Sequence, residues 1–141
     1  MIRDAQPGDL ARIVEMGTRF INETSYGRYV RPNEECMSKL VAGLIENKGV
    51  LLSEQGETIT GMLGFMIHRH FISGDIVAGE IFYWVEPEAR GEGLKLLHEM
   101  EKRARQAGAK NMQMIAPTDK FARVLGRLHW DPVETTFQKN L

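Results

Sequence analysis

Apolar residues recur at intervals of three and four positions in four segments of the chain, as they do along one face of an amphipathic helix. These segments are residues 10–21, 37–45, 96–107 and 121–128. Residues that favour a helix start precede three of them: Pro7, Asn33 and Thr118. Gly108 follows the third segment, where a helix commonly ends. The pattern therefore predicts four helices.

Stretches rich in β-branched and aromatic residues lie around these helices and predict strands. Glycine-containing turns at residues 55–57 and 73–75 join three of the stretches as consecutive hairpins. Gly61 and Gly64 interrupt the middle stretch, which indicates a bulge or the close approach of another group. The predicted strands begin at Ile2 and cover residues 50–54, 58–68, 76–85, 112–116 and 134–138. The order β-α-α-β-β-β-α-β-α-β predicts an α/β protein with a mixed sheet.

Composition narrows the class of protein. A length of 141 residues suits one domain, residues 1–141, and a net charge of −1 argues against general binding to nucleic acid. The sequence contains no apolar run of about 20 residues that could span a bilayer, and its first residues have no signal-peptide pattern. We therefore expect a cytoplasmic protein without a membrane partner. Cys36 is the only cysteine and, next to Met37 in a helical stripe, is predicted to be buried, with an exposed, oxidation-prone thiol as the alternative.

A short glycine-bearing turn, residues 90–95, separates the strand 76–85 from the third helix. The first turn of a helix leaves main-chain N–H groups unpaired at the positive end of its dipole, and such a site binds anions. The turn has neither the ending of a P-loop nor the Gly-x-Gly-x-x-Gly pattern, so we expect a pyrophosphate to be held by another scheme. A nucleotide-binding domain is accordingly the weaker alternative.

Residues 87–94 resemble the acetyl-coenzyme A signature of the GCN5-related N-acetyltransferase (GNAT) family, Gln/Arg-x-x-Gly-x-Gly/Ala, with Arg90 and Gly93 in matching positions. Lys95 stands where the signature has glycine or alanine. The opening residues 2–10 resemble the first strand and helix start of the family, and residues 128–139 resemble its closing hairpin. The three similarities occur in the family's order along the chain.

The resemblance implies a GNAT-like acyltransferase fold and acetyl-coenzyme A as co-substrate. It implies that main-chain groups of Trp84 and Val85 line the pantetheine arm. It also implies that the turn holds the pyrophosphate through Arg90, Gly91, Glu92, Gly93, Leu94 and Lys95. Lys95 either pairs with a phosphate of the coenzyme or is a solvated lysine on the outer face of the helix.

Glu80 is the predicted general base. It lies on the strand that leads into the pyrophosphate turn, as the glutamate base does in the histone-acetylating branch of the family. Alternation along the strand places Glu80 on the same face as Phe82 and Trp84, and aromatic surroundings would raise the pKa of its carboxyl group. The alternative is a solvated glutamate or a salt-bridge partner.

The family's usual acid is a tyrosine on the last helix, and Leu125 occupies that position here. Thr118 stands for the family's asparagine, and His129 stands for its glycine. A leucine cannot protonate a thiolate, so another donor is needed. Tyr83 and His129 are the candidates, with water as a third possibility.

The loop between the first two helices is where the family usually shapes its acceptor site. Tyr26, Arg28, Tyr29 and Arg31 are the candidates here, and they could grip a carboxylate or phosphate of the acceptor. A surface loop or a dimer contact is the alternative. His68 and His70 share one strand face, but a third ligand is not evident nearby in sequence, so no metal is expected.

The sequence as a whole predicts an N-acetyltransferase that transfers the acetyl group directly to a primary amine of a small molecule or a protein, in a chain that could form a homodimer. The rival hypothesis is a non-catalytic module of the same fold that binds coenzyme A or a protein partner.

Overall fold

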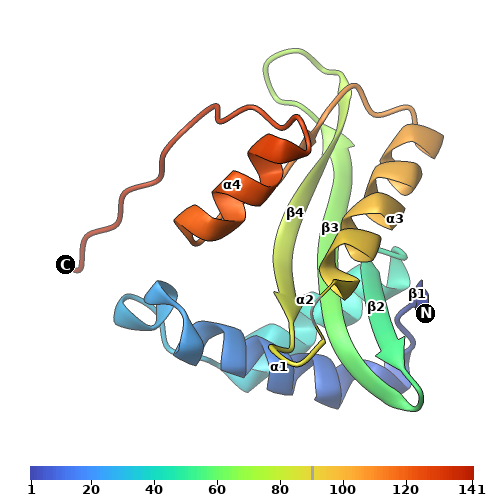
Figure 1. The fold of residues 1–141 in the computed structure, drawn as a ribbon, viewed down its shortest axis with the longest axis vertical. Coiled ribbons are helices and arrows are strands. Elements are labelled where there is room, and N and C mark those ends of the chain that lie inside the picture. Colours follow the sequence, from blue (N-terminus) through green and yellow to red (C-terminus); the bar gives the residue numbers. More distant parts are fainter. Residues whose placement is uncertain (90) are drawn as a thin grey trace.

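The computed structural model describes residues 1–89 and 91–141, and in these residues the chain folds into a five-stranded sheet with helices on both faces (Figure 1). The strands are β1 (Ile2–Asp4), β2 (Val50–Gln55), β3 (Thr58–Arg69), β4 (Ile76–Val85) and β5 (Met112–Gln113). The α-helices are α1 (Leu10–Glu23), α2 (Glu34–Glu46), α3 (Glu92–Gln106) and α4 (Asp119–Arg127), and the short 3-10 helices are η1 (Pro7–Asp9) and η2 (Ser25–Arg28). The predicted mixed α/β fold is confirmed.

The strands follow one another across the sheet in the order β1-β2-β3-β4-β5. β1 to β4 pair with one another in antiparallel fashion, and β5 runs parallel to β4. One hydrophobic cluster joins the sheet to α1 and α2 through residues such as Met16 and Leu44. The other joins it to α3 and α4 through residues such as Met100 and Leu125. The two pairs of helices therefore cover opposite faces.

β3 shows most clearly how this layering follows from the sequence. Its residues 59–65 are buried without interruption, because helices cover both faces of the central strand and both sets of alternating side chains are removed from water. The remaining residues of the strand, 66–69, are exposed at the end of the sheet. The hairpin that follows carries Phe71 and Ile72, which are also exposed.

A β-bulge sits in the middle of the β3–β4 pair. Gly64 pairs with Phe82 and Phe65 pairs with Glu80, so Ile81 is the extra residue on β4. A side-chain carbon at Gly64 would overlap the Phe82 ring, which explains the glycine. The predicted bulge or close approach is confirmed at this position.

The bulge overturns the expected grouping of the β4 side chains. Phe82 and Trp84 pack in the cluster under α1 and α2. Glu80 pairs with Phe65, which packs in the opposite cluster with Tyr83. Because the extra residue resets the alternation, Glu80 shares a face with Tyr83, and the prediction that it shares one with Phe82 and Trp84 was wrong.

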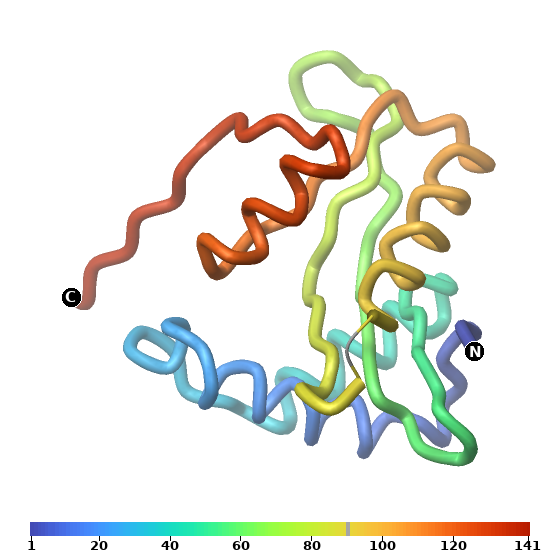
Figure 2. Tube along the Cα trace, viewed as in Figure 1, coloured from blue at the N-terminus to red at the C-terminus, as the bar shows by residue number. Residues whose placement is uncertain are grey.

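The end of the chain also differs from the prediction. Residues 128–141 form neither the expected strand 134–138 nor a closing hairpin. They cross instead toward η2 (Figure 2), where the Asn140 side-chain amide donates a hydrogen bond of 3.3 Å to the Arg28 carbonyl. Val133 and Phe137 are 80% and 89% exposed. A closing strand was predicted here, but β5 extends over only two residues and pairs with β4, and residue 134 meets it only through a hydrogen bond of 2.9 Å from the Gln113 side-chain amide to the Glu134 carboxylate.

Two helix starts form as predicted. The Asn33 side chain accepts a hydrogen bond from the Cys36 N–H (3.0 Å), and the Thr118 hydroxyl accepts one from the Phe121 N–H (3.2 Å). Cys36 itself is exposed, so its predicted burial was wrong. The first turn of α2 precedes the point at which the helix packs on the sheet. None of the helices in the described residues has the length and apolar character needed to cross a membrane.

Candidate active site

β4 and β5 run side by side for only two residue pairs and then separate. Ala78 pairs with Met112 and Gly79 with Gln113, and Glu80 is the next residue of β4. A cavity of about 340 Å³ opens there. Its walls are β4, the segment from α1 to residue 30, residues that follow β5, and the C-terminal segment at Gln138. The separation of the two strands therefore exposes the second half of β4 to a bounded space.

Glu80 lies half-buried in the wall of this cavity. Its carboxylate accepts one hydrogen bond, of 3.1 Å, from the Ile115 N–H. No basic side chain among the described residues forms an ion pair with it. Burial raises the pKa of Glu80 from 4.5 to about 7, and the Ile115 N–H opposes only part of this rise. A carboxylate of this pKa can take and release a proton near neutral pH.

Tyr83 lines the same cavity and extends from it to the start of α3. A side-chain carbon at Gly93 would overlap the Tyr83 hydroxyl, so the glycine makes room for the phenol. The ring stacks on Phe121 of α4, with centroids 5.2 Å apart. Burial raises the pKa of Tyr83 to about 12, so the hydroxyl keeps its proton at neutral pH. Tyr83 thus presents a protonated phenol on the cavity wall, next to the start of α3.

The predicted pyrophosphate turn lies at the N-terminus of α3. Gly91 adopts a left-handed conformation (φ 97°) and precedes the helix, which begins at Glu92. The first turn leaves N–H groups without partners in the helix, and Gly91 and Leu94 are exposed there. Main-chain amides at this exposed helix start suit a phosphate group. Arg90, the predicted side-chain contact, lies outside the described residues.

Two side chains of the turn bind each other. The Lys95 ammonium donates to the Glu92 carboxylate at 2.8 Å, and the Ser53 hydroxyl donates to the same carboxylate at 3.2 Å. The Lys95 side chain is 63% exposed. The structure therefore places Lys95 as a solvated lysine on the outer face, and contact with a phosphate would require it to leave Glu92.

Trp84 and Val85 point to opposite faces of β4. Trp84 packs under α1, where Phe20 meets its ring edge-on at 6.2 Å and the Arg19 guanidinium lies 5.8 Å from its centroid. Val85 packs in the cluster under α3. The side chain of Trp84 is thus turned away from the face that carries Glu80. The contact that the resemblance implies is with its main chain and does not involve this side chain.

The predicted acceptor group is only partly brought together. Tyr26 lines the cavity with Glu80, and the pKa of its hydroxyl is raised by burial and by the Glu80 charge. Arg28, Tyr29 and Arg31 are exposed and do not line the cavity. Val30, which was not among the predicted residues, lines the cavity instead. Its apolar side chain in a polar loop was the available signal.

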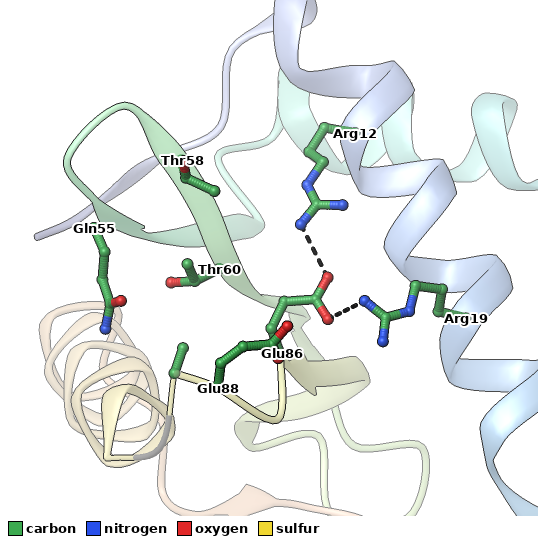
Figure 3. Close-up of a pocket in the computed structure, with 8 residues that line it drawn as sticks. Arg12, Arg19, Gln55, Thr58, Thr60, Glu86 and Glu88 are labelled. Atoms are coloured by element: carbon green, nitrogen blue, oxygen red, sulfur yellow. Dashed lines mark hydrogen bonds and ion pairs between the residues drawn. The ribbon is translucent and has the colours of Figure 1, made fainter.

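A second carboxylate, Glu86, was not anticipated from the sequence. It is 6% exposed and lies just beyond β4, where Arg12 and Arg19 of α1 both bind it (Figure 3). The Arg12 contact measures 2.9 Å, and Arg12 also donates to the Ile59 carbonyl at 3.0 Å. The two arginines are seven residues apart and so share one helix face, which was the only sequence signal. This cluster fixes α1 to the start of the β4–α3 turn.

The remaining candidates have structural surroundings. Leu125 is 7% exposed and packs in the cluster under α4. His129 follows the end of α4 with a left-handed backbone (φ 66°), which suits the position where the family has glycine. The His70 ring accepts weak contacts from the Ile72 and Ser73 N–H groups in its own hairpin. Within the described residues, no group of three potential metal ligands comes together.

Comparisons with known proteins identify the family of the chain. Residues 18–126 match the Acetyltransferase (GNAT) family. Among curated proteins, no significant sequence match was found.

Solved structures share the fold over the whole chain. A transcriptional regulator from Bacillus halodurans C-125 superposes with a TM-score of 0.79 at 19% identity, over 100% of this chain and 99% of its own. The enzyme AAC(6')-Iy, in complex with the bisubstrate analogue CoA-S-monomethyl-acetylneamine, superposes with a TM-score of 0.77 at 12% identity, over 100% and 97% of the two chains. A predicted acetyltransferase from Clostridium acetobutylicum, solved with acetyl-CoA, gives 0.76 at 14% identity, over 99% and 95%. The family match covers most of the sequence, and the chain belongs to the GNAT acetyltransferase family.

Proposed function

We propose that this protein transfers an acetyl group from acetyl-coenzyme A to a primary amine, with Glu80 as general base. The observation that carries the proposal is the surroundings of Glu80. Its carboxylate has a pKa of about 7, has no ion-pair partner in the described residues, and lines a cavity that also contains the Tyr83 phenol.

The coenzyme supplies the activated acetyl thioester. The main-chain amides at the start of α3 are the groups that would hold its pyrophosphate. The main chain of β4 beyond Gly79 is free of β5 pairing and would hold the pantetheine arm. This arrangement would direct the thioester toward the cavity between Glu80 and Tyr83.

The chain's own residues then move protons. An ammonium group bound beside Glu80 must lose a proton before it can attack, and Glu80 accepts that proton directly or through water. The amine then attacks without a covalent enzyme intermediate. The Tyr83 hydroxyl, protonated at neutral pH, is the donor available for the departing thiolate. Holding the amine and the thioester close together in one cavity would also raise the rate.

The test is an assay of thiol release with acetyl-coenzyme A and a panel of primary amines. We expect turnover by the wild type and loss of about two orders of magnitude or more in the Glu80→Gln variant. Calorimetric titration with acetyl-coenzyme A should give the same affinity for both proteins, because Glu80 is not among the groups that hold the coenzyme. Absence of turnover with every amine would contradict the proposal.

A non-catalytic coenzyme-binding module is the second candidate, and one observation favours it. Leu125, which stands at the family's usual acid position, is a packed core residue and cannot donate a proton. Binding of acetyl-coenzyme A without thiol release from any amine would select this candidate. A Tyr83→Phe variant with unchanged turnover would remove Tyr83 as the substitute donor.

A further inference from the structure

The walls of the cavity around Glu80 restrict the kind of amine that fits. Glu80 is the only charged side chain among the described residues that line it. Besides Gln138 and two tyrosine hydroxyls, the lining is apolar: Phe20, Ile21, Val30, Ile81, Ile115 and Pro117. The cavity therefore joins one carboxylate to an apolar compartment.

Aromatic rings form one wall of this compartment. The rings of Phe20 and Tyr26 lie 5.4 Å apart at 47° to each other. Such tilted rings offer faces and edges to a flat apolar group, which adds to the stabilisation from burial alone. Tyr26 and Glu80 both line the cavity, so the ring and the carboxylate border the same space.

An acidic acceptor would meet no positively charged side chain among the described residues that line the cavity. Arg28, the basic residue of η2, is exposed and does not line the cavity. A carboxylate or phosphate on the acceptor would therefore face Glu80 without a compensating cation, and like charges at short distance repel. The expectation of an acceptor gripped by arginines is not supported by this geometry.

We propose that the acceptor is a small primary amine carried on an apolar, aromatic body, with its ammonium group beside Glu80 and its ring against Phe20 and Tyr26. The volume of about 340 Å³ lies at the low end of ligand pockets, roughly 300–1,000 Å³, and so suits a small molecule. This inference rests on the proposed acetyltransferase function and specifies its substrate class.

The first experiment compares amines in the thiol-release assay. Phenylethylamine should exceed spermidine and glutamate in kcat/KM by a factor on the order of ten or more, because only its body gains from apolar burial. A peptide with a free N-terminus serves as the macromolecular comparison. Equal or better turnover of spermidine, glutamate or the peptide would overturn this inference and leave the acetyltransferase function standing. Thiol release with none of the amines would end both.

Matched variants locate the effect. Ile81 and Ile67 lie on adjacent strands and are 39% and 37% exposed, but only Ile81 lines the cavity. Ile81→Arg should lower kcat/KM for phenylethylamine by about tenfold and improve the relative use of glutamate, whereas Ile67→Arg should change neither. Equal behaviour of the two variants would overturn the inference.

Val30→Arg, on the opposite wall, repeats the test without altering the bulge. Val30 has the same 39% exposure as Ile81 and belongs to the loop after η2, so its replacement perturbs no strand pairing. The same shift from phenylethylamine toward glutamate is expected. A Val30→Arg variant that folds and keeps the wild-type preference would count against the inference even if Ile81→Arg is unstable.

Discussion

Two glutamates, Glu80 within β4 and Glu86 just beyond it, differ in what surrounds them. Glu86, 6% exposed, is bound by the guanidinium groups of Arg12 and Arg19. Glu80, half-buried, accepts a single N–H from Ile115, and its pKa rises to about 7. A buried carboxylate with two cationic partners holds elements together. One without such a partner retains a proton near neutral pH and is available for chemistry.

The backbone explains why the two residues differ. The bulge at Ile81 turns Glu80 to the face of α3 and α4, next to the space that β5 leaves open. Glu86 lies past the last strand pair, where its N–H donates to the Thr60 carbonyl at 2.8 Å and its side chain meets α1. A few residues therefore separate a group in the cavity from a group in a structural cluster.

The largest expected effect comes from Glu80→Gln. It should lower kcat by about two to four orders of magnitude, because the amide keeps the shape but cannot accept the proton. It should not destabilise the fold at pH 8. The folded-state pKa of Glu80 lies above its unfolded value of 4.5. The free energy of unfolding therefore falls as the pH rises from about 4.5 to about 7, and glutamine, which does not ionise, avoids this loss of stability.

Glu46→Gln, at the exposed end of α2, is the control for this substitution. It should leave kcat and the midpoint of urea unfolding unchanged. If Glu80→Gln kept the full kcat, Glu80 would lose its assignment as the base. If it lowered kcat and stability together, the carboxylate would be structural, as Glu86 is.

Glu86→Ala should have the next largest effect, and on stability. It removes the carboxylate that Arg12 and Arg19 share, and breaking a buried ion pair on one side costs about 3 kcal/mol. Urea unfolding measures this loss. Glu88→Ala, in the same loop but exposed, should change the free energy of unfolding by no more than about 0.5 kcal/mol. Equal losses of stability in the two variants would show that Glu86 contributes no more to the fold than an exposed glutamate.

Gly93→Ala should have the smallest effect. The added carbon overlaps the Tyr83 hydroxyl, and the Tyr83 ring is held by Phe121, so we expect a loss of about 1–2 kcal/mol from overpacking. Tyr83→Phe in the same chain should recover part of it. Additive effects of the two substitutions in a double-mutant cycle would show that the phenol and the glycine do not meet.

Much of the fold could be predicted because it depends on local signals. Asn33 and Thr118 each accept the hydrogen bond that a helix start requires, and Gly108 takes the left-handed conformation (φ 79°) after α3. The segment 134–138 was predicted as a closing strand, but a strand needs a neighbouring backbone, and its sequence does not show whether one is present. Cys36 lies next to an apolar stripe and yet is exposed, since neighbours in sequence point to different sides of a helix.

The sequence predicted which strand carries the candidate site residues, but it did not predict which face of the sheet each side chain occupies. Glu80 and Tyr83 were selected as candidates on this strand, and both line the cavity, but simple alternation placed Glu80 with Trp84, because the extra residue at Ile81 arises from pairing with β3. The Glu86 cluster was missed for a related reason. Arg12 is separated from Glu86 by 74 positions, and only the folded sheet brings α1 against the β4–α3 turn.

The central claim is that Glu80 accepts the amine proton with a pKa near 7, and the pH dependence of kcat/KM for the wild type and for Glu80→Gln tests it most directly. The wild type uses the bound ammonium, so its kcat/KM should be constant above about pH 7 and fall about tenfold per pH unit below it, where the carboxyl group is protonated. Glu80→Gln can use only the free amine, so its kcat/KM should rise with pH without a break near pH 7. A wild-type profile without a break near pH 7 would contradict the account.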